Sequence, residues 1–348
     1  MLGSRWRRRQ TAVAGLLAAA GWLLFLAGLV QAQNSSQATT VPSEAKALNS
    51  ILRQWGKPAN VKQWNTTGDP CSGFAIDDSI QLENPAYNPF IKCDCSYDSG
   101  TTCHITELKV YALDAIGVLP DELWSLNFLI NLDLAQNYLT GPISSSIGNL
   151  TRMQYLSFGI NALSGKLPKE LGSLTQLSSL SFATNNFSGS LPAELGNLTS
   201  LQQLYFSSSG VSGVIPSTFA NLQNLATVWA SDNELTGSIP DFIGNWTKLT
   251  DLRLQGNSFV GSIPSTFANL ISLNNLRISD ISNGSSSLAF IKNLKSLNIL
   301  VLRNNNISDS LPSSFGDYQS LSLLGMLVLV SAIVLWWFFV VIGSLWFT

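Results

Sequence analysis

A step of 24 residues runs through most of this 348-residue chain and constrains its fold more than any other feature. Three residue types keep this step in a fixed register: Leu108, Leu132, Leu156, Leu180, Leu204, Leu252, Leu276 and Leu300, with Val228 in the gap; Asn137, Asn161, Asn185, Asn233 and Asn257; and Gly141, Gly165, Gly189, Gly213, Gly237 and Gly261. One such turn cannot bury its own leucines, so neighbouring turns must stack. We predict a right-handed α/β solenoid over residues 105–320.

Each repeat is expected to begin with a short strand. In the segment Leu132-Asp133-Leu134 the two leucines point inward and the aspartate points outward, because side chains alternate along a strand. The following Asn137 turns the chain and can hydrogen-bond backbone groups that would otherwise be buried without partners. We therefore predict that the strand of each turn pairs in parallel with the strand of the next.

The first residues are typical of an export signal. Arg5, Arg7, Arg8 and Arg9 precede an apolar run that ends near Val30, and Ala32 closes a small-residue cleavage site. An uncleaved anchor is the alternative reading. We predict a signal peptide over residues 1–32 and a mature chain that begins near Gln33.

Four cysteines lie close together, at Cys71, Cys93, Cys95 and Cys103. In an exported chain this cluster predicts two disulfides that stabilise an N-terminal cap over residues 33–104. Four cysteines allow three pairings, and the sequence does not choose among them; the loop between Cys95 and Cys103 is the easiest to close, and that pairing would leave Cys71 with Cys93. The alternative is a metal site built from Cys93, Cys95, Cys103 and His104, but the spacing matches no zinc pattern, and we predict no metal.

A helix is predicted at the start of the cap, from Pro42 to about Trp55. Ser43 is expected to be its N-cap, and one face carries the apolar side chains Ala45, Leu48, Ile51, Leu52 and Trp55. This face would cover the open core of the first turn.

The repeat unit resembles the plant-specific class of leucine-rich repeats. Its pattern is seen in Leu163, Gly165, Leu167, Pro168, Leu171 and Leu174, and the stretches 111–114, 158–161, 241–248 and 301–307 resemble the ectodomains of plant leucine-rich-repeat receptor-like serine/threonine kinases. The likeness is to the subfamily whose repeats precede a malectin-like domain. It implies 24-residue plant-type repeats, a cell-surface receptor and a cytoplasmic kinase.

The C-terminal part departs from that plan. No malectin-like segment follows the repeats, and the glycine-rich loop, catalytic Asp and Asp-Phe-Gly elements of a kinase are absent, so we expect no enzyme activity. Residues 321–347 instead carry no charged side chain and are long enough for a hydrophobic transmembrane helix. A glycolipid-anchor signal and an altered reading frame are the alternatives.

Eight N-glycosylation sequons fit an extracellular location, at Asn34, Asn65, Asn149, Asn186, Asn197, Asn245, Asn283 and Asn306. Glycans there would crowd the flanks and the convex side. The concave strand face would then be the cleaner surface, although an asparagine such as Asn149 could instead satisfy backbone groups.

One outward column on the strand face changes character along its length. It reads Asp133, Ser157, Ser181, Tyr205, Trp229, Arg253, Arg277 and Val301. Aromatic and arginine side chains are enriched in binding hot spots. We predict a ligand site at Tyr205, Trp229, Arg253 and Arg277, with Asp251 at its edge; the alternative is arginine stacking that merely covers an aromatic ring.

Composition restricts the function classes. Charged residues make up 11% of the chain, the formal net charge is −2, and His104 is the only histidine. There is no basic field for nucleic acid, and a single histidine argues against a mechanism that needs a histidine base. We predict no cofactor. We predict a plasma-membrane receptor-like protein that binds a protein, a peptide or a cell-wall glycan, with a co-receptor ectodomain as a possible partner. The alternatives are a soluble apoplastic inhibitor of cell-wall-degrading enzymes and a truncated product of a receptor-like kinase gene.

Overall fold

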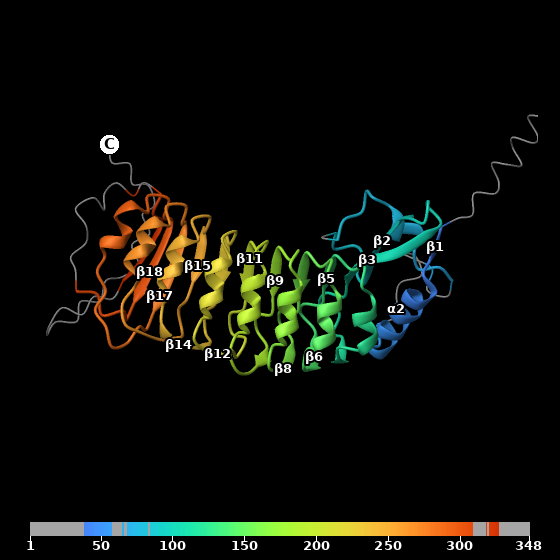
Figure 1. Ribbon diagram of the computed structural model, residues 1–348, viewed down its shortest axis with the longest axis horizontal. Coiled ribbons are helices and arrows are strands. Elements are labelled where there is room, and N and C mark those ends of the chain that lie inside the picture. Colours follow the sequence, from blue (N-terminus) through green and yellow to red (C-terminus); the bar gives the residue numbers. More distant parts are fainter. Residues whose placement is uncertain are drawn as a thin grey trace, which may run out of the picture.

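The computed structural model describes residues 38–57, 65, 68–82, 84–308, 318 and 320–326. The predicted signal peptide, Asn34 and residues 327–348 lie outside this part of the chain. Within it the chain forms an elongated solenoid that runs from the N-terminal cap to the last strands without a break (Figure 1).

A 12-stranded sheet forms one face of the solenoid. Its members are β1 (Thr39–Thr40), β2 (Phe90–Tyr97), β3 (Thr102–Lys109), β5 (Asn131–Asp133), β7 (Tyr155–Ser157), β9 (Ser179–Ser181), β11 (Gln203–Tyr205), β13 (Thr227–Trp229), β15 (Asp251–Arg253), β17 (Asn275–Ser279), β18 (Ile299–Arg303) and β19 (Leu323–Met326). From β3 onward each strand pairs in parallel with the next, as predicted, and only β2 pairs antiparallel, with β3.

Two smaller parallel sheets form a flank of the solenoid. The first contains β4 (Ile116–Val118), β6 (Tyr138–Gly141), β8 (Ala162–Gly165) and β10 (Asn186–Phe187), and the second contains β12 (Ser212–Gly213), β14 (Glu234–Ser238) and β16 (Ser258–Val260). They follow the asparagine of each turn, where the predicted glycines lie.

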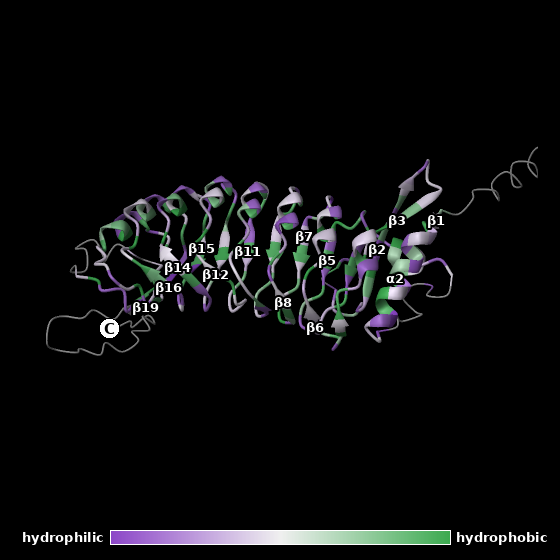
Figure 2. Cartoon of the chain, turned by 60° about the horizontal axis from the view of Figure 1, so that its bottom comes forward, coloured by the Kyte–Doolittle hydropathy of each residue, from purple (hydrophilic) through white to green (hydrophobic). Residues whose placement is uncertain are grey.

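Short 3₁₀ helices form the side opposite the main sheet (Figures 1 and 2). These are η2 (Asp121–Ser125), η3 (Ser145–Asn149), η4 (Lys169–Ser173), η5 (Ala193–Asn197), η6 (Ser217–Asn221), η7 (Asp241–Asn245), η8 (Ser265–Asn269) and η9 (Ala289–Asn293); η1 (Gly73–Ile76) lies in the cap. Several of these 3₁₀ helices contact the next turn at a glycine, where there is no room for a side chain. A Cβ atom on Gly244 would lie 2.4 Å from the carbonyl oxygen of Thr266, so a side chain there would separate neighbouring turns.

The inward leucine column is buried as predicted. Leu132, Leu156, Leu252 and Leu276 have no exposed surface, and they belong to one continuous core that also includes the cap. Truncating such a leucine to alanine typically costs about 2–5 kcal/mol. Stacking of the turns is therefore the main source of stability.

The asparagine ladder satisfies buried backbone groups, as predicted. The Asn137 amide nitrogen donates to the carbonyl oxygens of Val110, Leu134 and Ala135 at 2.6, 3.0 and 3.1 Å. Its side-chain oxygen accepts from the backbone N–H groups of Leu113 and Ala115. Each asparagine thus joins two successive turns.

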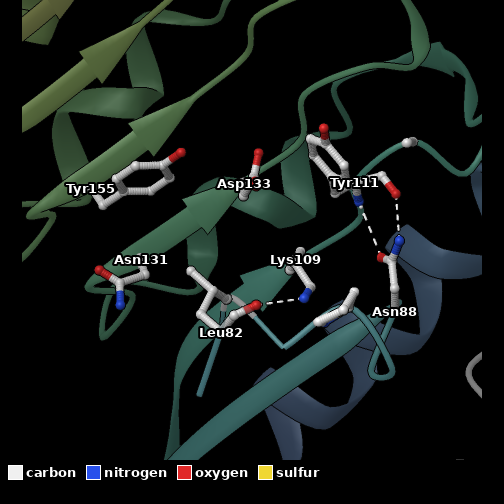
Figure 3. A pocket seen from close by; sticks show the side chains of 9 residues that line it. Leu82, Asn88, Lys109, Tyr111, Asn131, Asp133 and Tyr155 are labelled. Carbon is white, nitrogen blue, oxygen red and sulfur yellow. Dashed lines mark hydrogen bonds between the residues drawn. The ribbon is translucent and has the colours of Figure 1, made fainter.

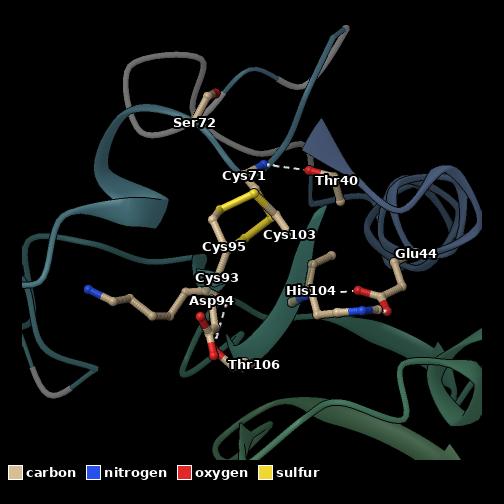
Figure 4. The surroundings of a disulfide bond; sticks show 12 residues. Thr40, Glu44, Cys71, Ser72, Cys93, Asp94, Cys95, Cys103, His104 and Thr106 are labelled. Carbon is tan, nitrogen blue, oxygen red and sulfur yellow. Dashed lines mark hydrogen bonds and ion pairs between the residues drawn. A yellow bond between two sulfur atoms is a disulfide. The ribbon is translucent and has the colours of Figure 1, made fainter. Parts of the chain in front are cut away.

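The cap is held by two disulfides, as predicted, and the structure assigns the pairing that the sequence left open: Cys71–Cys93 and Cys95–Cys103 (Figure 4). The four sulfur atoms are paired with one another, so the alternative metal site is wrong. His104 is instead a structural residue, because its Nδ1 atom lies 2.6 Å from a Glu44 carboxylate oxygen and its ring stacks on Phe128.

Helix α2 (Pro42–Gln54) confirms the predicted cap helix, with two differences in detail. Val41, not Ser43, is the N-cap, and no side chain caps the helix; Pro42 occupies its first turn, where a missing N–H is tolerated. Ala47 is buried in the core, whereas Ala45 is only partly buried. Trp55, directly after the helix, links the cap to the solenoid because its indole N–H donates to the Val118 carbonyl oxygen at 2.9 Å.

The C-terminal boundary of the repeats differs from the prediction. Leu323–Met326, which we included in the hydrophobic helix, form strand β19 and pair with β18 in the main sheet. No helix among the described residues has the length and apolar character needed to cross a membrane. The rest of the predicted hydrophobic segment, 327–347, lies outside the described residues.

We predict that Asn137→Ala lowers the free energy of unfolding by about 2 kcal/mol, because several buried backbone groups lose their partner. Urea unfolding followed by circular dichroism measures the loss. Asn269→Ala is the matched control: this asparagine is exposed at the end of η8, and its truncation should cost less than about 0.5 kcal/mol. Equal losses in the two variants would contradict the structural role of the ladder.

Candidate functional site

Four of the predicted site residues lie in one register column of the main sheet. Tyr205 pairs with Trp229, Trp229 with Arg253, and Arg253 with Arg277, on the adjacent strands β11, β13, β15 and β17. Neighbouring strands are ~4.8 Å apart, so the four side chains extend over ~15 Å. Together with Asp251 we call them the aromatic–arginine stripe.

The centre of the stripe is a layered stack. The rings of Tyr205 and Trp229 meet edge to face with centroids 4.9 Å apart, and the Arg253 guanidinium lies 3.8 Å from the centroid of the Trp229 ring. Asp251 accepts two hydrogen bonds from Arg253, at 3.0 and 2.9 Å. The charge of Arg253 is therefore already compensated, and this part of the stripe is rigid before any ligand arrives.

The far end of the stripe carries the cation that remains available. Arg277 uses its Nε atom to donate to the Asn275 side-chain oxygen at 3.1 Å, and Asn275 donates in turn to Asp251. No carboxylate of the described residues lies within ion-pair distance of Arg277. Its terminal guanidinium nitrogens can thus bind an acceptor from outside.

Three polar atoms beside the stack are buried without a hydrogen-bond partner among the described residues. They are the Trp229 indole nitrogen, the Ser231 hydroxyl oxygen and the Gln255 amide oxygen. Ser231 and Gln255 lie on neighbouring turns, joined by the hydrogen bond from Asp232 N–H to the Gln255 carbonyl. Burial also raises the pKa of the Tyr205 phenol. Desolvated polar groups of this kind gain stability when a ligand supplies the missing partners.

The seven sequon asparagines within the described residues are all exposed: Asn65, Asn149, Asn186, Asn197, Asn245, Asn283 and Asn306. Three of them end the 3₁₀ helices η3, η5 and η7, on the side opposite the main sheet. Asn149 is exposed and so does not have the buried backbone role we allowed for it. None of the seven lies within a strand of the main sheet.

A pocket opens on the same face, where the cap meets the first repeats (Figure 3). This cap pocket has a volume of about 540 Å³. Its lining residues are Leu82, Pro85, Asn88, Lys109, Tyr111, Ala112, Asn131, Asp133 and Tyr155.

The wall of the cap pocket is fixed by hydrogen bonds between the cap loop and the solenoid. The Lys109 ammonium donates to the carbonyl oxygens of Leu82 and Asn84. Asn88 accepts from the Tyr111 N–H at 3.2 Å and donates to the Tyr111 carbonyl oxygen. The pocket is therefore present without a ligand.

Asp133 contributes the carboxylate of the pocket. One of its oxygens accepts from the Ala135 N–H at 3.0 Å, and burial raises its pKa, against the smaller opposing effects of that hydrogen bond and of Lys109. The sequence placed Asp133 outward in the column but gave no reason to select it. The one sequence signal was a carboxylate followed by Ser157 and Ser181 at the same position; the cap loop that encloses it could not be placed from sequence.

The repeats match the family model described as Leucine Rich Repeat, at residues 128–150, 176–198, 200–222, 248–270 and 293–318. Two probable leucine-rich-repeat receptor-like serine/threonine-protein kinases of Arabidopsis thaliana are 56% identical to the chain, over 111 and 101 residues. These stretches cover 31% and 29% of this chain but only 11% and 10% of the relatives. The chain thus spans about a tenth of the length of the curated relatives that it matches.

Solved structures of plant receptors have the same fold. The PEPR1–AtPEP1 crystal structure aligns with a TM-score of 0.66 and 28% identity, over 83% of this chain and 38% of that one. The Arabidopsis thaliana GASSHO1/SCHENGEN3 ectodomain in complex with CASPARIAN STRIP INTEGRITY FACTOR 2 gives 0.55 and 26%, over 64% and 30%. The plant peptide hormone receptor RGFR1 in complex with RGF2 gives 0.50 and 28%, over 64% and 43%. The predicted fold class is confirmed.

Proposed function

We propose that this leucine-rich-repeat solenoid, similar over its repeats to plant receptor-like kinase ectodomains, is an extracellular receptor-like protein that binds a peptide or protein on its strand face and is not catalytic in this form. The observation that carries the proposal is the aromatic–arginine stripe. A Tyr205–Trp229–Arg253 stack ends in an available Arg277, in a column whose preceding members, Ser157 and Ser181, are small hydroxyl residues.

The chemistry of the stripe suits an extended peptide with a carboxylate near one end. Arg277 can bind that carboxylate through two parallel hydrogen bonds. The Trp229 and Tyr205 rings supply apolar area for the preceding residues. After small side-chain rotations, the Gln255 amide oxygen and the Ser231 hydroxyl could form hydrogen bonds with the backbone of a bound peptide. A purely apolar ligand would leave these two polar groups without partners.

The sequon positions support the choice of face. Glycans on Asn149, Asn197 and Asn245 would project from the opposite side, and the strands of the main sheet carry no sequon in the part of the chain that the structure describes. Among the similar solved structures, RGFR1 is described as a peptide hormone receptor in complex with RGF2. This likeness favours a peptide over other ligands for the present chain.

The test begins with a ligand recovered from the peptide pool of extracellular fluid on the immobilised chain, identified by mass spectrometry and resynthesised. Trp229→Ala and Arg277→Ala should each weaken its binding about thirtyfold, which corresponds to about 2 kcal/mol for a binding hot spot. Isothermal titration calorimetry measures the affinity, and thermal melting reports on folding.

Two matched substitutions serve as controls. Ser181→Ala lies in the same column as Trp229, and Arg303→Ala removes an exposed cation at the end of β18. Both should bind as the wild type does. If Trp229→Ala and Arg277→Ala also bind normally with unchanged melting, the stripe is only a covered aromatic ring and the proposal is wrong.

We further propose that residues 327–347 attach the protein to a membrane, with the repeats outside. The segment is apolar and has no charged residue, and such a stretch is costly to leave in water. Deleting residues 327–348, which keeps β19 in the sheet, should release the protein into the medium. Recovery of the full-length chain in the soluble fraction after carbonate extraction would contradict this attachment.

A further inference from the structure

The cap pocket is separate from the aromatic–arginine stripe. Asp133 lies on β5 and Trp229 on β13, with β7, β9 and β11 between them in the sheet. Four steps of ~4.8 Å along the same column place Asp133 and Trp229 ~19 Å apart. A small group bound in the cap pocket would therefore not contact the stripe, and any function of the pocket stands independently of the function proposed above.

Asp133 is the charged group of the pocket that lacks a counter-ion. No cation of the described residues lies within ion-pair distance of its carboxylate. Lys109, which pairs with Asp133 across β3 and β5, exerts only the smallest of the effects on the pKa of this carboxyl group. Its ammonium donates to the carbonyl oxygens of Leu82 and Asn84 and lies 5.6 Å from the centroid of the Phe90 ring. Lys109 therefore holds the cap loop, and Asp133 presents negative charge inside a partly enclosed space.

Two tyrosine rings stand on either side of this carboxylate. In Figure 3 Asp133 lies between Tyr155, from the next strand, and Tyr111, from the segment after β3. The Tyr111 hydroxyl accepts a hydrogen bond from the Gln136 side chain at 2.5 Å, and Asn88 binds both backbone groups of Tyr111. Tyr111 is thus fixed in place as a wall of the pocket.

We propose that the cap pocket binds the guanidinium group of an arginine side chain presented by a protein or peptide partner, with Asp133 as its counter-ion and Tyr111 and Tyr155 as its aromatic walls. A carboxylate can accept two parallel hydrogen bonds from a guanidinium. The flat cation also stacks on aromatic faces, and it is more weakly hydrated than an ammonium. An anion would be repelled by Asp133, and a neutral group would leave the carboxylate without a counter-ion.

The desolvation of Asp133 is consistent with such a role. Burial raises its pKa, which means that the charged carboxylate is less stable here than in water. If this position served only the fold, an uncharged serine would be more favourable than an aspartate. Serine does occupy positions 157 and 181 of the same column. A bound guanidinium would remove this penalty, so the cost is recovered on binding.

The probe for the test is N-acetyl-L-arginine methylamide, titrated into the full-length purified chain by NMR or calorimetry. Its citrulline counterpart has the same shape without the charge, and its lysine counterpart has the charge without the planar fork. The arginine compound should bind at least tenfold more tightly than either. Equal binding of the arginine and citrulline compounds would overturn the counter-ion role, and equal binding of the lysine compound would overturn the assignment to guanidinium.

Substitutions test the residue assignment. Asp133→Asn should weaken binding of the arginine compound at least tenfold. Its melting temperature should equal or exceed that of the wild type, because the substitution removes a partly desolvated negative charge. Asp114→Asn is the matched control, because Asp114 is an exposed carboxylate on the neighbouring loop; it should bind as the wild type does. Unchanged binding by Asp133→Asn would overturn the proposal. If this variant fails to fold, Tyr155→Leu should still lower the affinity at least threefold, and unchanged affinity there has the same meaning.

Discussion

The hydrogen bonds of the ladder asparagine side chains, which are buried at positions 137, 233 and 257 and partly buried at positions 161 and 185, are the interaction on which the rest of the molecule depends. No single turn has enough apolar surface to be stable alone, and each turn leaves backbone groups that no strand pairs. Asn137, Asn161, Asn185, Asn233 and Asn257 each donate to carbonyl oxygens of the preceding turn and of their own. This ladder keeps the strands in register, and register in turn places the outward side chains in straight columns. The binding face is therefore a consequence of the interior.

Much of the fold could be predicted from sequence because the repeat makes each position predictable from its neighbours 24 residues away. The inward leucines, the parallel pairing and the outward column all follow from one period. The exceptions are local. At Ser209 the ladder lacks its asparagine, yet the serine backbone and hydroxyl donate to Asn233 and the turn is maintained. At β19 apolar composition suggested a helix, whereas pairing with β18 gives a strand; tertiary context decided the outcome.

The binding face could be predicted only in part. The stripe was found because its residues repeat in the same register as the leucines. The ion pair within the stripe could not be predicted. The sequence does not show that Asp251 neutralises Arg253 and leaves Arg277 as the available cation. The cap pocket could not be predicted because part of its wall comes from the cap residues Leu82, Pro85 and Asn88, which belong to no repeat. Hydrogen bonds of Lys109 and Asn88 hold this part of the cap over the first strands. A repeat pattern does not predict which non-repeating segments lie next to the repeats in the folded chain.

We propose that this solenoid recognises its partner with the strand face and not with its flank. Site-specific photo-crosslinking tests it most directly. A photoreactive phenylalanine analogue would replace Tyr205 in the stripe, or Tyr138 on β6 of the flank, whose side chain is 60% exposed. A peptide or protein partner that binds the strand face should be crosslinked through position 205 and not through position 138. Crosslinking through position 138 alone, with none through position 205, would contradict it.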